Sequence, residues 1–363
     1  MKHILQKLFI LLIIQLIIQL IISTQLQAQQ EKILKLKNPN SWTMVLIPDP
    51  QSYVKSEQNQ PIMDIITNWI KANIDEMNIK LVMCTGDLVD NNKDTIPDPK
   101  YGGNQNGWQQ WNAISRSFKK LDNKVPYILC VGNHDIETSN GEGRYSQFNS
   151  WFPPNGNKLT ENLLVDMLPN ASGIKTMENA YYKFISPQGV PFLIFSLEFN
   201  PRDTIVKQAI KIVHQKKYEN YKGIILTHSY LKADNTRIKK EDYLLKDVTC
   251  GEKLWQELIA PSKNIEMVFC GHIAGNSHRE NVGYRVEKNA ANKDVHQILF
   301  NAQWEGGGPN GNGGDGWIRI FEFSPDKKTV FVKTFSPFFA ISPSTVDKAF
   351  RTEDYDQFYF TLN

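Results

Sequence analysis

Five short apolar runs, each followed at once by a compact polar cluster, recur along this chain of 363 residues. The runs lack strict alternation of apolar and polar residues, which is typical of strands buried on both faces of a sheet. They cover residues 42–47, 79–84, 125–131, 223–226 and 265–270. Because the carboxyl ends of such strands line the ligand crevice when helices flank the sheet, we expect the polar clusters to converge.

The polar clusters consist of carboxylates, amides and imidazoles. They read Asp49-Pro50-Gln51, Gly86-Asp87-Leu88-Val89-Asp90-Asn91, Gly132-Asn133-His134-Asp135, Thr227-His228-Ser229 and Gly271-His272. A single Asp or Asn after a strand is commonly a turn residue or a helix cap. Turn chemistry does not require two histidines as well, so the joint pattern predicts a metal site. Glycine directly before the polar residue in three clusters suits sharp turns and close backbone approach.

The remaining pattern predicts an α/β fold of stacked sheets flanked by helices. Further strands are expected at 191–197, 295–300, 317–323 and 329–334, and helices at 61–77, 108–121 and 203–214. Segments 91–106 and 139–176 are interpreted as surface excursions. The glycine-rich segment 306–316 is interpreted as a loop or wide hairpin, because it lacks the Lys and Ser/Thr of a P-loop and precedes a strand. Residues 29–363 are expected to form one domain.

The N-terminus has the pattern of a secretory signal peptide. A basic start precedes the Leu- and Ile-rich run 8–22, and Leu26-Gln27-Ala28 predicts cleavage after Ala28. We therefore expect a secreted or periplasmic protein with no transmembrane segment in the mature form; an uncleaved anchor is the alternative. The full chain carries a formal charge of +3, which gives no support to a nucleic-acid polymer as partner.

The four cysteines do not form a metal-binding pattern, because neither Cys-x-x-Cys nor zinc-finger spacing occurs. Cys84, Cys130 and Cys270 lie within apolar runs and are expected to be buried free thiols. Cys250 is expected to be the most exposed of the four. Its disulfide state is left open.

The polar clusters, in the order in which they follow one another along the chain, resemble those of the calcineurin-like metallophosphoesterases. The resemblance extends from about Trp42 to Phe335. The pair Gly-Asp-x-x-Asp-Asn and Gly-Asn-His-Asp is the most specific part. Four further motifs look most like the family's secreted bacterial branch: Ser196-Leu197-Glu198, Thr227-His228-Ser229-Tyr230-Leu231, Cys270-Gly271-His272 and Val295-His296-Gln297-Ile298-Leu299. The resemblance implies a four-layer αββα sandwich with two mixed β-sheets and a centre of two divalent metal ions, Mn, Zn, Fe or Mg.

The resemblance also implies a role for each residue of the clusters. Asp49 would bind the first metal, Asp87 would bridge both metals, and Asn133, His228 and His272 would bind the second. His134 would face the phosphoryl group and assist the leaving oxygen, and Asp135 would orient His134 through a hydrogen bond. Tyr230, Asn301, Gln303 and Trp304 follow strands near the expected site and could shape the pocket or serve packing.

Two departures from the family pattern weaken the first metal position. The first motif has Gln51 where the family usually has His, and Ala274 stands where the last motif usually has its second His. Gln51 could still coordinate through its side-chain oxygen, and Asp90 and His278 are possible additional ligands. We expect the first site to prefer harder metal ions than the second site does, and to exchange its metal ion more readily.

The resulting prediction is a secreted, metal-dependent phosphoric ester hydrolase. A metal-bound hydroxide would attack a phosphomonoester or phosphodiester in line. The expected partner is a small phosphorylated substrate, and the expected state is a monomer. The alternative function is a single-metal, catalytically weak binding protein for a phosphorylated or carbohydrate ligand. The depleted first site motivates that alternative.

Overall fold

The computed structural model describes residues 13–19, 34–97, 103–136 and 143–363. The chain divides into two compact units, Met1–Leu36 and Lys37–Asn363. In the first unit, residues 13–19 are helical, and the expected cleavage point after Ala28 lies outside the described residues. Among the described residues, no helix has both the length and the apolar character needed to cross a membrane.

The first of two mixed sheets in the second unit has the strand order β13-β12-β11-β1-β2-β3, and β14 pairs with β12. Its central strands β1, β2 and β3 are parallel, whereas β11 runs antiparallel to β1. The strands are β1 (Trp42–Ile47), β2 (Ile79–Cys84), β3 (Tyr127–Leu129), β11 (Ile318–Phe323), β12 (Thr329–Phe335), β13 (Phe350–Arg351) and β14 (Phe358–Thr361).

The second sheet has the strand order β4-β5-β6-β7-β8-β10-β9. Strands β6, β7, β8 and β10 are parallel, and antiparallel strands β5 and β9 pair with the outer two. The strands are β4 (Leu164–Pro169), β5 (Lys175–Ile185), β6 (Pro191–Ser196), β7 (Lys222–Leu226), β8 (Ile265–Cys270), β9 (Val282–Lys288) and β10 (Asp294–Phe300).

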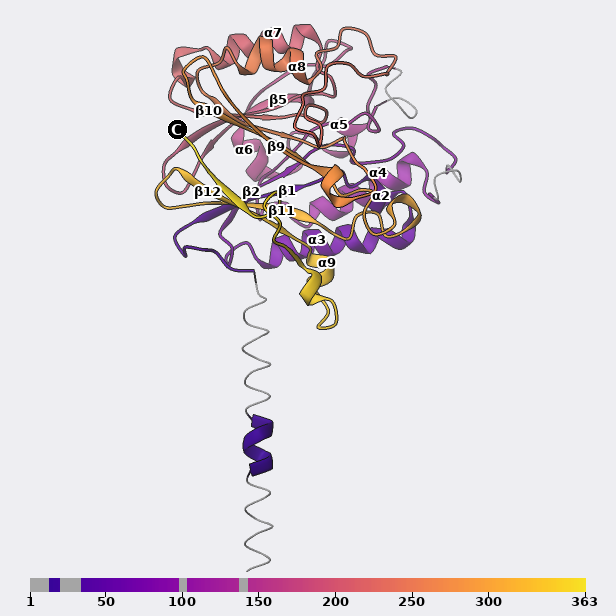
Figure 1. Ribbon diagram of the computed structural model, residues 1–363. Coiled ribbons are helices and arrows are strands. Elements are labelled where there is room, and N and C mark those ends of the chain that lie inside the picture. Colours follow the sequence, from indigo (N-terminus) through magenta and orange to yellow (C-terminus); the bar gives the residue numbers. More distant parts are fainter. Residues whose placement is uncertain (1–12, 20–33, 98–102, 137–142) are drawn as a thin grey trace, which may run out of the picture. The chain divides into compact units, whose positions relative to one another are not determined.

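Helices cover the outer faces of both sheets. Figure 1 shows α7 and α8 on one side of the sheets and α3 and α9 on the other. The α-helices are α2 (Gln51–Val54), α3 (Gln60–Ala72), α4 (Gly107–Lys119), α5 (Phe148–Trp151), α6 (Lys158–Leu163), α7 (Asp203–Val213), α8 (Gly251–Leu254) and α9 (Pro337–Ala340). The buried apolar face of α7 packs with β6, β7 and β8 in one core cluster. On the other side, Trp69 of α3 contacts Phe335 of β12.

Aromatic side chains fill the space between the two sheets. The Trp42 ring of β1 stacks on Phe323 of β11 with a centroid separation of 4.1 Å, and it lies 6.0 Å from Phe192 of β6. Phe269 of β8 and Phe321 of β11 make a further contact at 5.0 Å. The predicted arrangement of two mixed sheets flanked by helices is therefore confirmed.

The interpretation of segment 139–176 as a surface excursion is wrong, because it contains α5, α6 and β4 and so contributes an edge strand to the second sheet. Cys250 is the most exposed of the four cysteines, as expected, but at 6 % it is still buried, because α8 begins directly after it and packs Leu254 into the core. All four cysteines lie within the described ranges, and each is a buried free thiol.

Candidate metal centre

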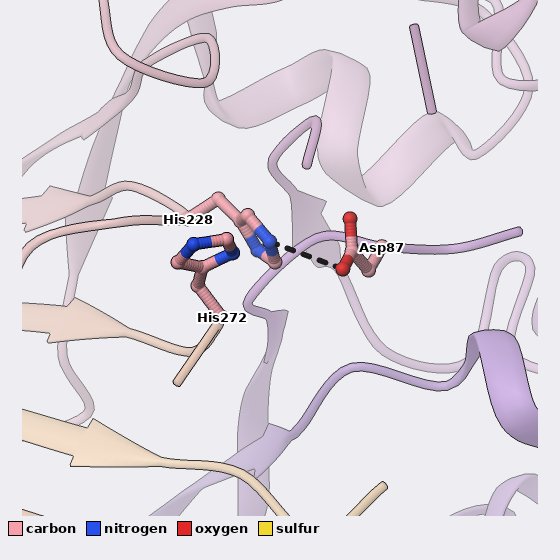
Figure 2. A group of neighbouring side chains, drawn as sticks. All are labelled: Asp87, His228 and His272. Carbon is pink, nitrogen blue, oxygen red and sulfur yellow. Dashed lines mark ion pairs between the residues drawn. The ribbon is translucent and has the colours of Figure 1, made fainter. Parts of the chain in front are cut away.

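The five polar clusters follow the carboxyl ends of β1, β2, β3, β7 and β8, and all of their residues lie in loops except Gln51, which begins α2. Three of their side chains, Asp87, His228 and His272, place one potential ligand atom each within 4.8 Å of one another. Figure 2 shows these residues converging from loops that are distant in the sequence. Asp87 and His272 both have a positive φ, at 50° and 68°. Such backbone is sparsely populated by residues other than glycine and is found where a site constrains it.

His228 is fully buried and its ring orientation is fixed by two kinds of contact. Nδ1 lies 2.8 Å from the carbonyl oxygen of Thr85, so it carries the proton that this acceptor needs. Nε2 points the other way, at 3.2 Å from Oδ2 of Asp87 and 3.1 Å from Oδ1 of Asn133. Burial lowers the pKa of His228, but the negative charges of Asp87 and Asp49 outweigh it and raise the pKa to about 10.

This arrangement fits a cation. Nε2 of His228 faces two oxygen acceptors in a buried site, so the position between them favours a positive charge, supplied either by a proton or by a metal ion. Burial raises the pKa of Asp87, but His228 and His134 outweigh it and hold the pKa well below its usual range. A carboxylate, an amide oxygen and two imidazoles form a donor set suited to small divalent transition metals.

Asp49 is held by hydrogen bonds to both of its oxygens. Thr85 donates to Oδ1 at 2.6 Å, and the backbone N–H of His272 and the side chain of Asn301 donate to Oδ2 at 2.7 and 2.8 Å. Burial raises the pKa of Asp49. The carboxylate therefore ties the β1 loop to the loop that carries His272.

Gln51 lies beside Asp87 and has a buried side-chain oxygen without a protein partner among the described residues. Its Nε2 donates to Oδ2 of Asp87 at 3.0 Å and also contacts Gln303. Its Oε1 is buried and has no hydrogen-bond partner among the described residues. A buried carbonyl oxygen without a partner is costly unless a cation or water satisfies it. The side chain next to Asp87 thus fits the neutral ligand expected at the first metal position.

His134 is the most accessible side chain of the clusters, with 28 % of it exposed. Its backbone N–H donates to Oδ1 of Asp87 at 3.0 Å, and its Nδ1 lies 2.9 Å from the carbonyl oxygen of Asp90. Burial lowers the pKa of His134, but Asp87 and Asp90 outweigh it and raise the pKa. A partly exposed imidazole beside the expected metal position suits a proton donor to a leaving group.

The expected hydrogen bond between Asp135 and His134 does not form in the described part of the chain. Asp135 instead accepts hydrogen bonds from the backbone N–H groups of Gly132 at 2.8 Å and Val89 at 3.0 Å. Burial and the nearby charge of Asp87 raise the pKa of Asp135 to about 7. The side chain turns toward the backbone because the tight loop leaves these amides without other acceptors. Asp135 therefore joins the β2 and β3 loops, and Asp90 supplies the partner of His134.

Close approach explains the glycines that precede the polar residues. A Cβ on Gly132 would collide with Oδ1 of Asp87, and one on Gly271 would collide with Oδ1 of Asp49. Both positions therefore require glycine for the carboxylates to reach the centre.

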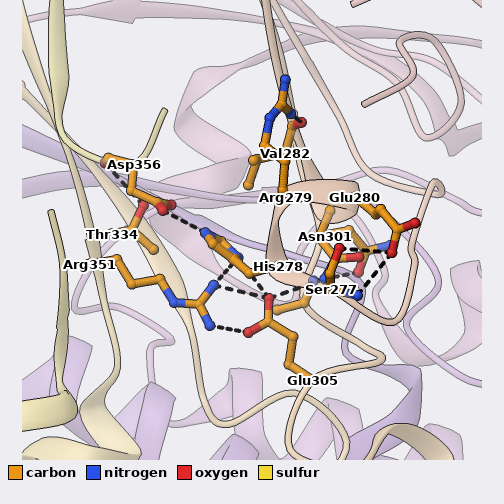
Figure 3. A network of polar contacts seen from close by, with 12 residues as sticks. Ser277, His278, Arg279, Glu280, Val282, Asn301, Glu305, Thr334, Arg351 and Asp356 are labelled. Atoms are coloured by element: carbon orange, nitrogen blue, oxygen red, sulfur yellow. Dashed lines mark hydrogen bonds and ion pairs between the residues drawn. The ribbon is translucent and has the colours of Figure 1, made fainter. Parts of the chain in front are cut away.

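The two possible additional ligands have other partners. Oδ1 of Asp90 lies 3.4 Å from Nζ of Lys55. His278 belongs to a separate polar network, shown in Figure 3, where Nδ1 lies 2.9 Å from Glu305 and Nε2 lies 2.5 Å from Asp356. His278 is therefore absent from the group formed by Asp87, His228 and His272 among the described residues.

One functional candidate at the centre carries no sequence signal. Glu241 lies in a polar loop, and its Oε2 is 3.2 Å from Nε2 of His272. Its neighbours in sequence are charged and exposed, so nothing in the local pattern distinguishes it. Asn301 and Gln303, which were expected at the edge of the site, contact Asp49 and Gln51 respectively.

Comparison with known proteins gives matches to a family and to a solved fold. The family model for calcineurin-like phosphoesterases matches residues 49–276. The chain is 27 % identical over 298 residues to the uncharacterized protein YvnB of Bacillus subtilis (strain 168), which covers 82 % of this chain and 20 % of that protein. It thus spans about a fifth of the length of this relative.

Two solved structures resemble the chain at low sequence identity. A dimetal phosphatase from Danio rerio aligns with a TM-score of 0.50 and 9 % identity, over 89 % of this chain and 99 % of that one. GAP50 of Plasmodium aligns with a TM-score of 0.42 and 11 % identity, over 89 % of each chain.

Proposed function

Since this chain belongs to the calcineurin-like phosphoesterase family, we propose that it is a metal-dependent hydrolase of small phosphomonoesters or phosphodiesters. One observation carries the proposal. Asp87, Asn133, His228 and His272 come from separate loops and converge on one buried position where Nε2 of His228 faces two oxygen ligands.

The second metal position has the fuller donor set, namely Asp87, Asn133, His228 and His272. The first position would use Asp49, Asp87 and the unsatisfied oxygen of Gln51. Bound divalent ions of this kind neutralise phosphoryl charge and make water a nucleophile near neutral pH. Asp87 contacts a member of each donor set, namely His228 of the second position and Gln51 of the first. It could therefore bridge the two positions.

His134 would transfer a proton to the leaving oxygen. The carbonyl oxygen of Asp90 accepts from Nδ1, which leaves Nε2 to face the substrate. The backbone N–H of His134 meanwhile holds Asp87, so the loop after β3, which carries the proton donor, is tied directly to the bridging carboxylate on the loop after β2. Such coupling keeps the leaving group and the metal position at a fixed separation.

The proposed substrate is small, and the protein is proposed to be a secreted or periplasmic monomer. The sequence of residues 1–28 supports secretion, because a basic start and a short apolar run precede Ala28. The small net charge supports a small phosphorylated substrate over a nucleic-acid polymer.

The direct test is hydrolysis of p-nitrophenyl phosphate and bis(p-nitrophenyl) phosphate, before and after chelation and again after Mn²⁺ is added back. We expect chelation to abolish turnover and Mn²⁺ to restore it. Asp87→Asn should remain inactive after the addition, whereas Asp354→Asn, which changes an exposed aspartate, should behave like the wild type. Turnover that survives exhaustive chelation would overturn the proposal.

A second candidate function is a single-metal binding protein for a phosphorylated ligand. The uneven donor sets favour it, because the described His, Cys, Asp and Glu residues form a ligand group at the second position only. Binding of inorganic phosphate that needs one metal equivalent, without turnover of either ester, would support this candidate over hydrolysis.

A further inference from the structure

The loop of residues 239–249 brings a carboxylate to the back of the metal centre. The loop leaves the core after Ile238, whose backbone N–H donates to Tyr230, and returns at Thr249, whose backbone N–H donates to Pro201. Glu241 lies between these anchors. Its Oε2 is 3.2 Å from Nε2 of His272, and its Oε1 accepts a hydrogen bond from Oγ of Ser229.

Glu241 therefore joins two loops that each carry a histidine of the centre. Ser229 directly follows His228, and His272 lies at the end of β8. The rings of His228 and His272 have centroids 5.0 Å apart. One carboxylate thus spans both loops, and it lies outside the group that Asp87 forms with the two histidines.

The contact also determines which nitrogen of His272 is available to a metal. A carboxylate accepts hydrogen bonds only, so Nε2 must carry the proton and Nδ1 keeps its lone pair. In Figure 2, one ring nitrogen of His272 turns toward His228 and Asp87, and the other turns away. Since Nε2 is the nitrogen that contacts Glu241, Nδ1 is the nitrogen that faces the centre.

We propose that Glu241 is a positioning residue that fixes the tautomer and ring angle of His272 for metal binding. The inference rests on the proposed function, because it takes His272 as a ligand of the second metal. A carboxylate behind a ligating imidazole also raises the basicity of the ligand, and loss of such a partner weakens metal affinity about 10- to 100-fold.

The test compares Mn²⁺ binding to the full chain and its variants by calorimetry. Glu241→Ala should weaken the tightest binding step by about 10- to 100-fold. Glu241→Gln should weaken it less, because an amide oxygen can still accept the hydrogen bond from Nε2. The matched control is Asp242→Asn, which changes the adjacent carboxylate, whose side chain is 97 % exposed. The control should bind Mn²⁺ like the wild type.

A second readout separates positioning from support of the fold. The ¹⁵N shifts of His272 in the metal-free protein should report an Nε2-protonated ring in the wild type and a mixture of tautomers in Glu241→Ala. Equal Mn²⁺ affinity in the wild type and Glu241→Ala would overturn this inference and leave the proposed function standing. Absence of Mn²⁺ binding in the wild type would contradict the proposed function itself.

Discussion

The Nδ1 atom of His134 lies 2.9 Å from the backbone carbonyl oxygen of Asp90, so the acceptor that orients this ring is main chain. The side-chain oxygen of Asp90 is farther away, at 3.9 Å from the same atom. A carbonyl acceptor fixes the ring as firmly as a carboxylate would, but it does not depend on the identity of residue 90. A substitution of Asp90 would therefore leave this acceptor in place, and the role of the ring is tested by substituting His134 itself.

His134→Ala should lower kcat by about 10²- to 10⁴-fold, the range that a positioned general acid contributes. The loss should be larger for an alkyl phosphate than for p-nitrophenyl phosphate, because a poor leaving group needs the proton more. Mn²⁺ affinity should stay within about threefold of the wild type. A variant that hydrolyses both esters at the wild-type rate would exclude the assigned role.

Gly271→Ala should disturb Asp49 and thereby the first metal position. The added Cβ would collide with Oδ1 of Asp49 and lie 2.7 Å from Oγ1 of Thr85, so the carboxylate must move. The matched control is Gly173→Ala, where nothing lies within 4 Å of the added Cβ and the φ of 79° costs about 1 kcal/mol. Calorimetry should show a lower affinity in one of the metal-binding steps of Gly271→Ala and unchanged affinities in Gly173→Ala. Unaltered metal binding there would mean that Asp49 is not a ligand.

Glu178 should make stability depend on pH. Burial and the charge of Glu198 raise its pKa from 4.5 to about 7. A raised pKa in the folded state means that stability is fully present below pH 4.5 and is lost as pH rises through about 7. The loss is about 3 kcal/mol, from that difference in pKa at 1.36 kcal/mol per pH unit.

Urea unfolding at pH 4.5 and pH 8 measures this effect. The free energy of unfolding of Glu178→Gln, relative to the wild type, should rise by about 3 kcal/mol between the two pH values. Glu219→Gln, at an exposed position, should show no such rise. A constant difference between Glu178→Gln and the wild type would show that the pKa of Glu178 is the same in the folded and unfolded states.

Gln51→His should strengthen the weaker metal step, because an imidazole binds transition metals better than an amide oxygen does. We expect at least a tenfold gain in affinity, about 1.4 kcal/mol, measured by calorimetry with Zn²⁺ or Mn²⁺. Asn59→His, at a buried amide that donates to Gly311, is the control and should leave both steps unchanged. If the affinity of the tighter step increased instead, Gln51 would belong to the second metal position.

The continuous apolar strands could be predicted from sequence because burial on both faces leaves a clear signal. The expected ranges 42–47, 79–84 and 265–270 coincide with β1, β2 and β8. Strand β5 gave no such signal, because it buries polar residues that find partners only in the fold. Asn149 donates to Glu178, and Asn179 donates to Glu198. The edge strand β9 is half exposed and therefore mixes residue types.

The convergence of the site could also be predicted, since its residues follow parallel strands. Asp87 and His228 lie 141 positions apart in the numbering, and their side chains are 3.2 Å apart. The finer contacts could not be predicted. Asp135 turns to backbone amides, and Glu241 reaches His272 from a loop whose path depends on distant anchors. Sequence pattern identifies the side chains at strand ends, whereas loop geometry decides their partners.

The most direct measurement of the central claim is a Mn²⁺ titration of the chelator-treated protein by calorimetry, alongside Asp87→Asn. The structure predicts two unequal steps in the wild type: a tight one at Asn133, His228 and His272, and a weaker one at Asp49 and Gln51. In the proposed site Asp87 would serve both positions, so Asp87→Asn should weaken both steps. Two equally tight steps in the wild type, or tight binding that survives in Asp87→Asn, would contradict the account.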